Sequence, residues 1–141
     1  MADTSATNSS QALAIAASAL HAQQTRMRII AENIANADST STTPGGDPYR
    51  RQMPIFQPTE VQRGATGVKM TSVTLDPTAF HQEYNPNHPA ADAKGYVKMP
   101  NVDPLIEALD MKEAQRAYDA NLNVIETERS MSGRLLDLIR K

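Results

Sequence analysis

Proline divides this chain of 141 residues into three parts. All nine prolines lie between Pro44 and Pro104, whereas residues 1–43 and 105–141 contain none. Because proline removes an amide donor and clashes with the preceding turn of a helix, long helices are possible only at the two ends. The sequence therefore predicts two terminal helices joined by a middle part that is not helical.

The N-terminal helix is predicted over residues 9–37, after a flexible segment over residues 1–8. Ser9, or the serine that follows it, can cap the first free amides of this helix. Asn33 and Asn36 are expected to end it, because asparagine tolerates the left-handed backbone and its side-chain amide can bind loose backbone groups.

Apolar residues of this segment recur at heptad spacing over four repeats, interrupted once by a glutamine at position 23. Such spacing places them along one side of the helix and is typical of helices that pack lengthwise against a partner. The stripe consists of Leu13, Ala16, Leu20, Met27, Ile30 and Ile34.

The C-terminal helix is predicted over residues 103–141. Asp103 can cap it, and Pro104 takes the first helical position, where a missing amide hydrogen costs nothing. Two adjacent stripes give it an apolar face wider than a two-stranded coiled coil requires, so we expect more than one neighbour. The first stripe contains Ala114, Ala117, Asn121, Val124, Glu128, Met131, Leu135 and Leu138, and the second contains Tyr118, Leu122, Ile125, Leu136 and Ile139.

Asn121 is a polar residue within the first of these stripes. It is either an exposed position or a buried one that weakens packing while fixing the register of the helices. The sequence leaves both readings open.

Residues 38–102 are predicted to form a small β subdomain of two to four strands, beginning with a mobile loop over residues 38–48. Pro54 restricts the first strand to an edge or irregular position. The fold class expected is α+β, mainly α, with the long terminal helices packed as a coiled-coil-like pair or bundle. The strand candidates are residues 49–56, residues 67–75 with a bulge at Ser72–Val73, and residues 95–99.

Composition excludes several classes of function. A net charge of −2 and a pI near 5.9 give no basic surface for nucleic acid or an anionic membrane. No apolar run approaches the roughly 18 to 20 residues that cross a bilayer, and the first ten residues lack the features of a cleavable signal peptide. The absence of cysteine rules out disulfides, thiolate zinc sites and cysteine nucleophiles. We expect no cofactor.

A metal-dependent enzyme is the alternative from another class. His81, Glu83 and His88 are the residues that could ligate a metal. Their spacing does not match a helical His-x-x-x-His arrangement, and Pro86 and Pro89 favour a loop, so we expect ordinary surface side chains here.

Three carboxylates near the start of the C-terminal helix could imitate a catalytic cluster: Glu107, Asp110 and Glu113. An enzyme would need some of them buried to shift their pKa values. Because Lys112 and Arg116 lie between and beside them, a solvated helix face is expected instead.

Two segments resemble known proteins. Residues 18–39 contain the block Asn-Ile-Ala-Asn-Ala at residues 33–37, and this segment resembles the N-terminal signature of bacterial flagellar rod and hook proteins. Residues 85–131 contain Gly-Tyr-Val-Lys-Met-Pro-Asn-Val-Asp and, further on, Arg-Ala-Tyr-Asp-Ala-Asn. The second segment resembles more narrowly the proximal-rod family of the flagellar basal body.

The resemblance implies a structural subunit without enzymatic activity, catalytic residues or a small-molecule substrate. Members of this family leave the cytoplasm through the flagellar type III apparatus without a cleaved signal peptide. They assemble in the periplasm, through their terminal helices, into the hollow drive shaft that carries torque from motor to hook. The implied partners are further copies of the chain, sister subunits of the proximal rod, the ring–rod junction and the distal rod, and the export apparatus. A helical export adaptor is a further alternative.

The stripes and the matched motifs together define the assembly interface that we expect. Its residues are Leu13, Leu20, Met27, Ile30, Asn33, Ile34, Asn36, Arg116, Tyr118, Asn121, Leu122, Ile125, Met131, Leu135 and Leu138.

Overall fold

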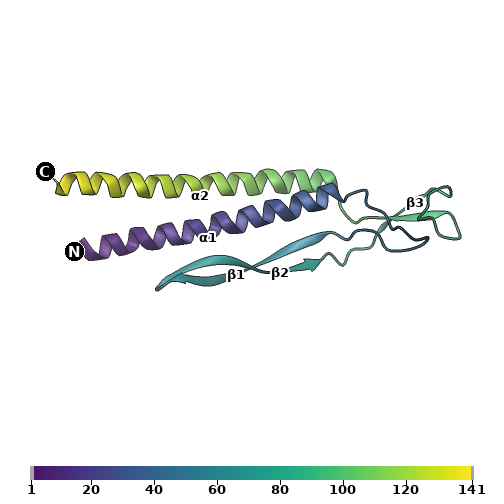
Figure 1. Cartoon of the computed structure of the whole chain (residues 1–141), viewed down its shortest axis with the longest axis horizontal. Helices are drawn as coiled ribbons and strands as arrows, with labels where there is room; N and C mark the ends of the chain where they lie inside the picture. The colour runs from purple at the N-terminus through teal and green to yellow at the C-terminus, as the bar shows by residue number, and fades with distance from the viewer. Residues whose placement is uncertain (1, 141) are drawn as a thin grey trace. The chain divides into compact units, whose positions relative to one another are not determined.

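The computed structural model describes residues 2–140, so that Met1 and Lys141 lie outside it, as do the side chains of residues 2–6 and of Ile139. Within this range the chain forms two long helices and four strands (Figure 1). The fold class is mainly α with a central β region, which confirms the prediction. The elements are α1 (Ala2–Ala35), β1 (Gln52–Gln62), β2 (Ala65–Leu75), β3 (His81–Tyr84), β4 (Tyr96–Met99) and α2 (Pro104–Ile139).

The chain divides into two compact units. Unit 1 consists of residues 1–26, 55–72 and 113–141, and unit 2 consists of residues 27–54 and 73–112. Helices α1 and α2 and the hairpin of β1 and β2 each contribute residues to both units.

Helix α1 begins at Ala2, earlier than the predicted start at Ser9 or Ser10, so residues 2–8 are helical. The two serine side chains have other partners within unit 1. Ser9 Oγ donates to Glu128 Oε2 at 2.7 Å, and Ser10 Oγ accepts a hydrogen bond from Gln62 Nε2 at 3.1 Å. These hydroxyls therefore connect α1 to neighbouring elements instead of capping it.

Helix α1 ends at Ala35, close to the predicted boundary, and Asn36 closes it. Asn36 Nδ2 donates to the carbonyl oxygen of Glu32 at 2.8 Å, while its Oδ1 accepts from Ser39 Oγ at 3.0 Å. The expected left-handed conformation is not used, because no non-glycine residue in the described range has a positive φ.

Helix α2 begins where the sequence predicts. Asp103 Oδ1 accepts a hydrogen bond from the amide of Leu105 at 2.9 Å, and Pro104 is the first helical residue. This is the expected N-cap arrangement. Over the residues described, neither α1 nor α2 combines the length and apolar character that spanning a membrane requires.

In unit 1 the two helices run alongside each other in opposite directions. Ser9 contacts Glu128 near one end, and Arg26 Nη2 lies 3.8 Å from Glu113 Oε2 near the other. Two small side chains of these helices, Ala16 and Ala114, are buried in the unit. Because both side chains are small, their burial removes little apolar area from water.

The hairpin of β1 and β2 packs onto α1 in unit 1. Its turn uses Gly64 at a φ of 77°, and the amide of Val68 donates to Ser18 Oγ at 3.1 Å. A Cβ on Gly67 would lie 2.3 Å from Ser18 Oγ and 2.7 Å from Val61 Cγ1. Only glycine permits this close approach of strand and helix.

The strand predicted over residues 67–75 is confirmed in β2, whereas the one predicted over residues 49–56 is only partly right, because β1 begins at Gln52 and continues to Gln62. Pro54 lies in a two-stranded sheet, where every strand has a free edge that tolerates its missing donor. The bulge expected at Ser72–Val73 stays a prediction.

In unit 2, β3 and β4 form a second, antiparallel sheet in which His81 faces Met99 and Tyr84 faces Tyr96. The strand predicted over residues 95–99 is confirmed, but the prediction that His81 and Glu83 lie in a loop is wrong. Pairing with β4 imposes the strand on an exposed, polar segment that carries no apolar alternation. The rings of Tyr84 and Tyr96 meet edge to face, with centroids 5.2 Å apart.

Residues 38–48 form a loop, as predicted. Hydrogen bonds connect it to the rest of unit 2: the amide of Gly45 donates to the Ala90 carbonyl at 3.0 Å, and Lys98 Nζ donates to Asp47 Oδ1 at 2.7 Å.

We expect Gly67→Ala to lower the free energy of unfolding by about 1 to 3 kcal/mol, because the added methyl group overlaps Ser18, whose hydroxyl is held by two hydrogen bonds. The control is Gly133→Ala on α2, where a Cβ meets nothing within 4 Å. It should stabilise the chain by about 0.5 to 1 kcal/mol through helix propensity. Urea unfolding followed by circular dichroism measures both changes, and equal effects would contradict the close approach.

Candidate functional site

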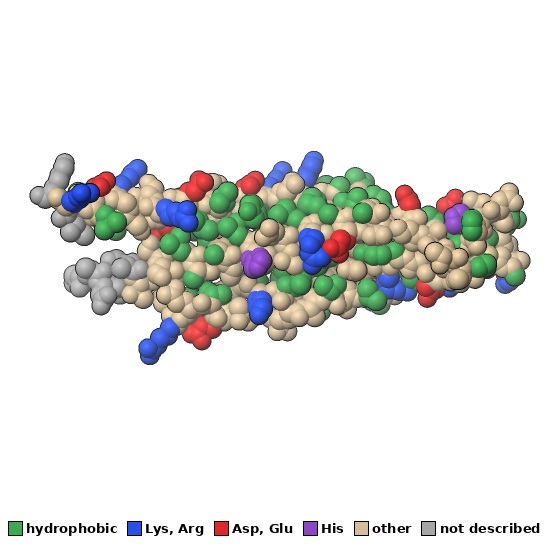
Figure 2. Space-filling model, viewed as in Figure 1, with side chains coloured by type: hydrophobic (Ala, Val, Ile, Leu, Met, Phe, Trp, Pro, Cys, Tyr) green, Lys and Arg blue, Asp and Glu red, His purple; other side chains and the backbone are tan. Residues whose placement is uncertain are grey.

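The C-terminal part of α2 carries large apolar side chains that the chain itself does not cover (Figure 2). Met131, Leu135 and Leu138, all from the first predicted stripe, are 52%, 53% and 73% exposed. Leu136 of the second stripe is 68% exposed. An exposed apolar row of this kind on a helix is typical of a surface that contacts another protein.

The side of α2 that its own unit covers runs between the two predicted stripes. The residues that are at least partly buried are spaced three or four apart, which is the spacing of a helix–helix seam. The remaining apolar positions flank this seam and stay in solvent. The seam consists of Ala114, Ala117, Tyr118, Asn121, Ile125, Glu128 and Ser132.

The predicted interface residues of α1 divide into two groups. Leu13, Leu20 and Met27 are half-buried, and Ile34 is exposed. Ile30 and Asn33, by contrast, are only 4% and 1% exposed, because their own chain covers them. These two side chains cannot offer a surface to another subunit, so we correct the predicted interface by leaving them out of the assembly surface. Asn36 is half-buried and closes α1.

The predicted residues in the middle of α2 are also mixed in exposure. Arg116 and Leu122 are exposed, while Tyr118 and Ile125 lie half-buried in the seam. Asn121 is half-buried, and its Nδ2 donates to the carbonyl oxygen of Ala117 in its own helix at 2.7 Å. The amide nitrogen thus has a partner within α2 itself, and a role of Asn121 in register stays a prediction.

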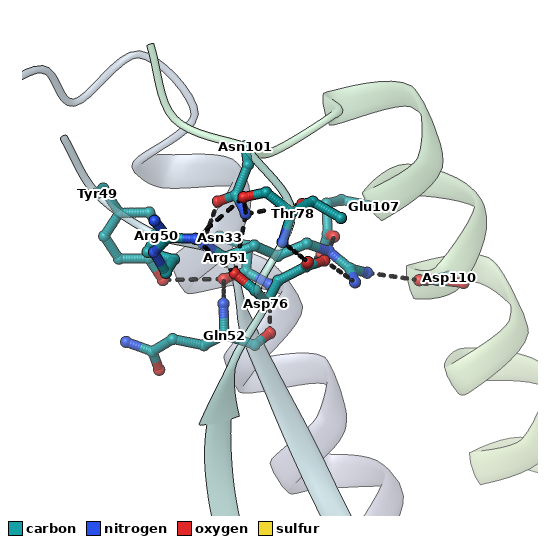
Figure 3. A network of polar contacts seen from close by, with 10 residues as sticks. All are labelled: Asn33, Tyr49, Arg50, Arg51, Gln52, Asp76, Thr78, Asn101, Glu107 and Asp110. Atoms are coloured by element: carbon teal, nitrogen blue, oxygen red, sulfur yellow. Dashed lines mark hydrogen bonds and ion pairs between the residues drawn. The ribbon is translucent and has the colours of Figure 1, made fainter. Parts of the chain in front are cut away.

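Unit 2 contains a buried polar network, which we call the Asn33 network (Figure 3). Asn33 Nδ2 donates to the carbonyl oxygen of Gln52 at 2.9 Å and to Glu107 Oε2 at 3.1 Å. Asn33 Oδ1 accepts from the amide of Gln52 and from the hydroxyl of Tyr49, each at 2.9 Å. All four hydrogen bonds that an amide side chain can make are used here.

Glu107 is fully buried, at 0% exposure, which overturns the prediction of a solvated face for this residue. Arg51 supplies the missing partner: its Nε donates to Glu107 Oε1 at 2.5 Å. Arg51 also lies 3.5 Å from Asp76 and 3.4 Å from Asp110. The side chain of Glu113 is 71% exposed and fits the prediction.

Asn101 connects the network to the segment that follows β2. Its Oδ1 accepts from the amide of Arg51 at 2.8 Å, and its Nδ2 donates to the carbonyl oxygens of Asp76 and Thr78, both at 3.2 Å. Arg50 donates to the same two carbonyls, and its guanidinium lies 4.1 Å from the centre of the Phe80 ring. The side chains of Asn101 and Arg50 therefore both bind the loop that contains Asp76 and Thr78.

The pKa shifts of Arg51 and Tyr49 agree with this arrangement of charges and hydrogen bonds. Partial burial of Arg51 is the largest single influence and opposes its charge, but Glu107, Asp76 and Asp110 together outweigh it and raise the pKa of Arg51. Burial, followed by the charges of Glu32 and Glu107, raises the pKa of Tyr49. The network thus favours a charged arginine and a neutral tyrosine that donates to Asn33.

The Asn33 network connects three elements of unit 2. It joins the last turns of α1, the start of β1 and the first turn of α2 within unit 2 through groups that satisfy one another. Replacing a buried ion pair by apolar residues is often neutral, whereas removing one partner is costly. We infer that the network specifies a single arrangement of these segments. Sequence reasoning identified Asn33 and Asn101 by motif but missed Arg51, Tyr49 and Asp76, whose only signal was their polarity.

The structure does not assemble a metal centre from the predicted candidates. No three His, Cys, Asp or Glu side chains come together as possible ligands within the described part of the chain. His88 Nδ1 accepts a hydrogen bond from the amide of Ala90 at 3.1 Å, and His81 and Glu83 are neighbours on an exposed strand.

Comparison with protein families identifies both ends of the chain. Residues 13–41 match the family described as flagella basal body rod protein. Residues 93–138 match the family described as the C-terminal region of flagellar basal body rod FlgEFG proteins. The long terminal helices with an exposed apolar row, joined by a small β region, are thus those of a flagellar basal-body rod protein.

Curated relatives narrow this class. The flagellar basal-body rod protein FlgC of Agrobacterium fabrum is 49% identical over 132 residues, covering 93% of this chain and 95% of the relative. FlgC of Escherichia coli O6:H1 is 46% identical, with 88% and 92% covered, and FlgC of Bacillus subtilis is 34% identical, with 89% and 95% covered. The chain belongs to the FlgC family of flagellar basal-body rod proteins.

We expect Arg51→Ala to lower the free energy of unfolding by about 3 kcal/mol, because it leaves the Glu107 carboxylate buried without its cation. Urea unfolding measures the change. The double variant Arg51→Ala/Glu107→Leu should recover part of it, since the stranded charge is gone.

The matched control is Arg28→Ala, which removes an arginine paired with Glu32 on the exposed face of α1. Its cost should be about 0.5 kcal/mol or less. Equal losses for Arg51→Ala and Arg28→Ala would show that the Asn33 network is not buried in solution.

The Asp76 carboxylate gives a pH-dependent test. Hydrogen bonds from the backbone and hydroxyl of Thr78, followed by the charge of Arg51, lower the pKa of Asp76. Because the folded pKa lies below the unfolded value of about 3.9, this group stabilises the fold above about pH 4, and the contribution disappears as the pH falls through the folded pKa.

Asp76→Asn should therefore cost about 1.5 kcal/mol at pH 7 and pH 5 and progressively less below pH 4. Chemical unfolding at a series of pH values measures the difference from the unmodified chain. Asp119→Asn on the exposed face of α2 is the control and should show little difference. A difference in unfolding free energy between the Asp76→Asn variant and the unmodified chain that increases as the pH falls would contradict the lowered pKa of Asp76.

Proposed function

We propose that this protein is a structural subunit of the proximal rod of the bacterial flagellum. Like the relatives named as basal-body rod proteins, it would assemble with other rod components. Its terminal helices would pack with those of neighbouring subunits to build the hollow shaft that transmits torque from motor to hook. In this role it catalyses no reaction and binds no small-molecule substrate.

The observation that carries the proposal is the exposed row Met131, Leu135 and Leu138 on α2. Fully burying one such side chain is worth roughly 1.5 to 3 kcal/mol. The row therefore makes exposure in water unfavourable and burial against a neighbour favourable. Membership in the FlgC family supplies the kind of neighbour, a rod component that approaches the same helix.

We further propose that the chain is exported by the flagellar type III apparatus without a cleaved signal peptide and assembles in the periplasm. The family resemblance supports this route. The sequence is compatible with it, because a chain without cysteine forms no disulfide that would hinder passage in an unfolded state. The neighbours we propose are further copies of the chain, sister proximal-rod subunits, the ring–rod junction and the distal rod.

The Asn33 network fits a load-bearing role. A shaft that transmits torque needs subunits with one defined conformation, and the network joins segments from α1, β1 and α2 with ion pairs and hydrogen bonds. We propose that the Asn33 network prevents unit 2 from deforming when torque passes between neighbouring subunits.

Leu135→Asp should abolish swimming, because a carboxylate in the exposed row cannot be buried against a neighbour without a partner. Cells that carry only this variant in place of the native gene are tested on soft agar, and basal bodies are prepared from them. We expect the variant chain to be produced and the rod to be missing.

The control is Ser130→Asp, a nearby exposed position outside the apolar row. It should leave at least part of the swimming rate intact. Normal swimming of the Leu135→Asp strain would contradict the proposed function of the row.

A further inference from the structure

The first two turns of α2 in unit 2 expose their apolar residues and bury their carboxylate. Leu105, Ile106 and Leu109 are 71%, 53% and 60% exposed, whereas Glu107 between them is 0% exposed. We call these three apolar side chains the α2 knob. The N-cap from Asp103 fixes the helix start, so the knob stands on a rigid base. None of its residues belongs to the predicted assembly interface.

Unit 1 contains a concave surface of matching character between α1 and the hairpin, which we call the hairpin groove. Its volume is about 310 Å³. The two hydroxyls that reach it from α1 already have partners: Ser18 Oγ accepts from the amide of Val68 and donates to the Ile15 carbonyl, and Thr25 Oγ1 donates to the His21 carbonyl. The groove is therefore apolar where a ligand would lie. Its apolar lining is Ala22, Val61, Val68 and Met70.

We infer that the α2 knob of one copy of this chain inserts into the hairpin groove of a second copy. The inference rests on the proposed function, because it describes how subunits of a rod contact each other. It adds two named surfaces to the proposed row Met131, Leu135 and Leu138.

Size supports this pairing. A protein cavity of about 150 Å³ holds a benzene ring, which has six carbon atoms. A groove of about 310 Å³ thus has room for about twelve carbon atoms, the number in the three four-carbon side chains of Leu105, Ile106 and Leu109.

The knob and the groove are different surfaces, which makes the contact heterologous. A heterologous contact that does not close on itself produces an open helical assembly instead of a symmetric dimer. This is the geometry that a rod requires, and each copy would offer one free knob and one free groove to its neighbours.

The test is cross-linking in assembled basal bodies with the variant Leu109→Cys/Met70→Cys, in a strain lacking the native gene. The chain contains no cysteine, so any bismaleimide product made only of copies of this chain must join the introduced thiols. We expect a ladder of dimers and larger products from the double variant and no ladder from either single variant. The control Leu109→Cys/Glu60→Cys places the second thiol on the other face of β1 from Val61 and should give no ladder.

A motile strain whose double variant gives only monomers would overturn the inference and leave the proposed function intact. Unimpaired swimming after deletion of the gene would instead overturn the proposed function. If the cysteine pair prevents assembly, benzoylphenylalanine at Leu109 replaces it. After irradiation we expect a product of two chains joined at residues 59–70, whereas a product with another protein, or with another site of a second copy, would overturn the inference.

Discussion

Helix α2 is 36 residues long, but its own chain covers it along only one narrow seam. The rest of the molecule depends on this one-sided packing. The small side chains Ala16 and Ala114 are buried in unit 1 but bury little apolar area. The large side chains that would strengthen a self-contained bundle lie on the flanks of the seam instead. The chain therefore leaves much of the apolar surface of α2 exposed, and we propose that other subunits cover it.

The two units use different means to hold their helices. In unit 1, the contacts are small buried side chains and a few hydrogen bonds such as Ser9 to Glu128. In unit 2, the Asn33 network joins the helix ends through the hydrogen bond from Asn33 to Glu107, whose charge is paired with Arg51. Apolar packing tolerates sliding, whereas Asn33 can satisfy its four hydrogen bonds in one arrangement only. The network thus defines conformation in unit 2, whereas unit 1 leaves the apolar row Met131, Leu135 and Leu138 exposed.

Part of this fold follows directly from the sequence. The confinement of proline to the middle of the chain predicts both helices, and Asp103 followed by Pro104 predicts the start of α2, because these are local effects of backbone chemistry. The start of α1 was missed, since Ser9 is used by Glu128, a partner 119 residues away. Local cap rules cannot detect such a competitor.

The site was less predictable than the fold. The sequence predicts a solvated carboxylate at Glu107. Its burial depends on Arg51, a partner 56 residues earlier in the chain that local sequence patterns do not reveal. The motif drew attention to Asn33 but not to its role, since the same pattern fits a helix end and a buried hub. The apolar row on α2 was predictable, because heptad spacing is visible in the sequence. Which side of that wide face the chain would cover for itself was not.

The central claim is that the row Met131, Leu135 and Leu138 is exposed in the single subunit and covered in the rod. Maleimide labelling of a Leu135→Cys variant tests it directly, because the chain has no other thiol. The account predicts rapid labelling of the purified chain, protection in intact basal bodies, and recovered labelling after those basal bodies are denatured. Labelling of the intact basal body as fast as that of the free chain would contradict it.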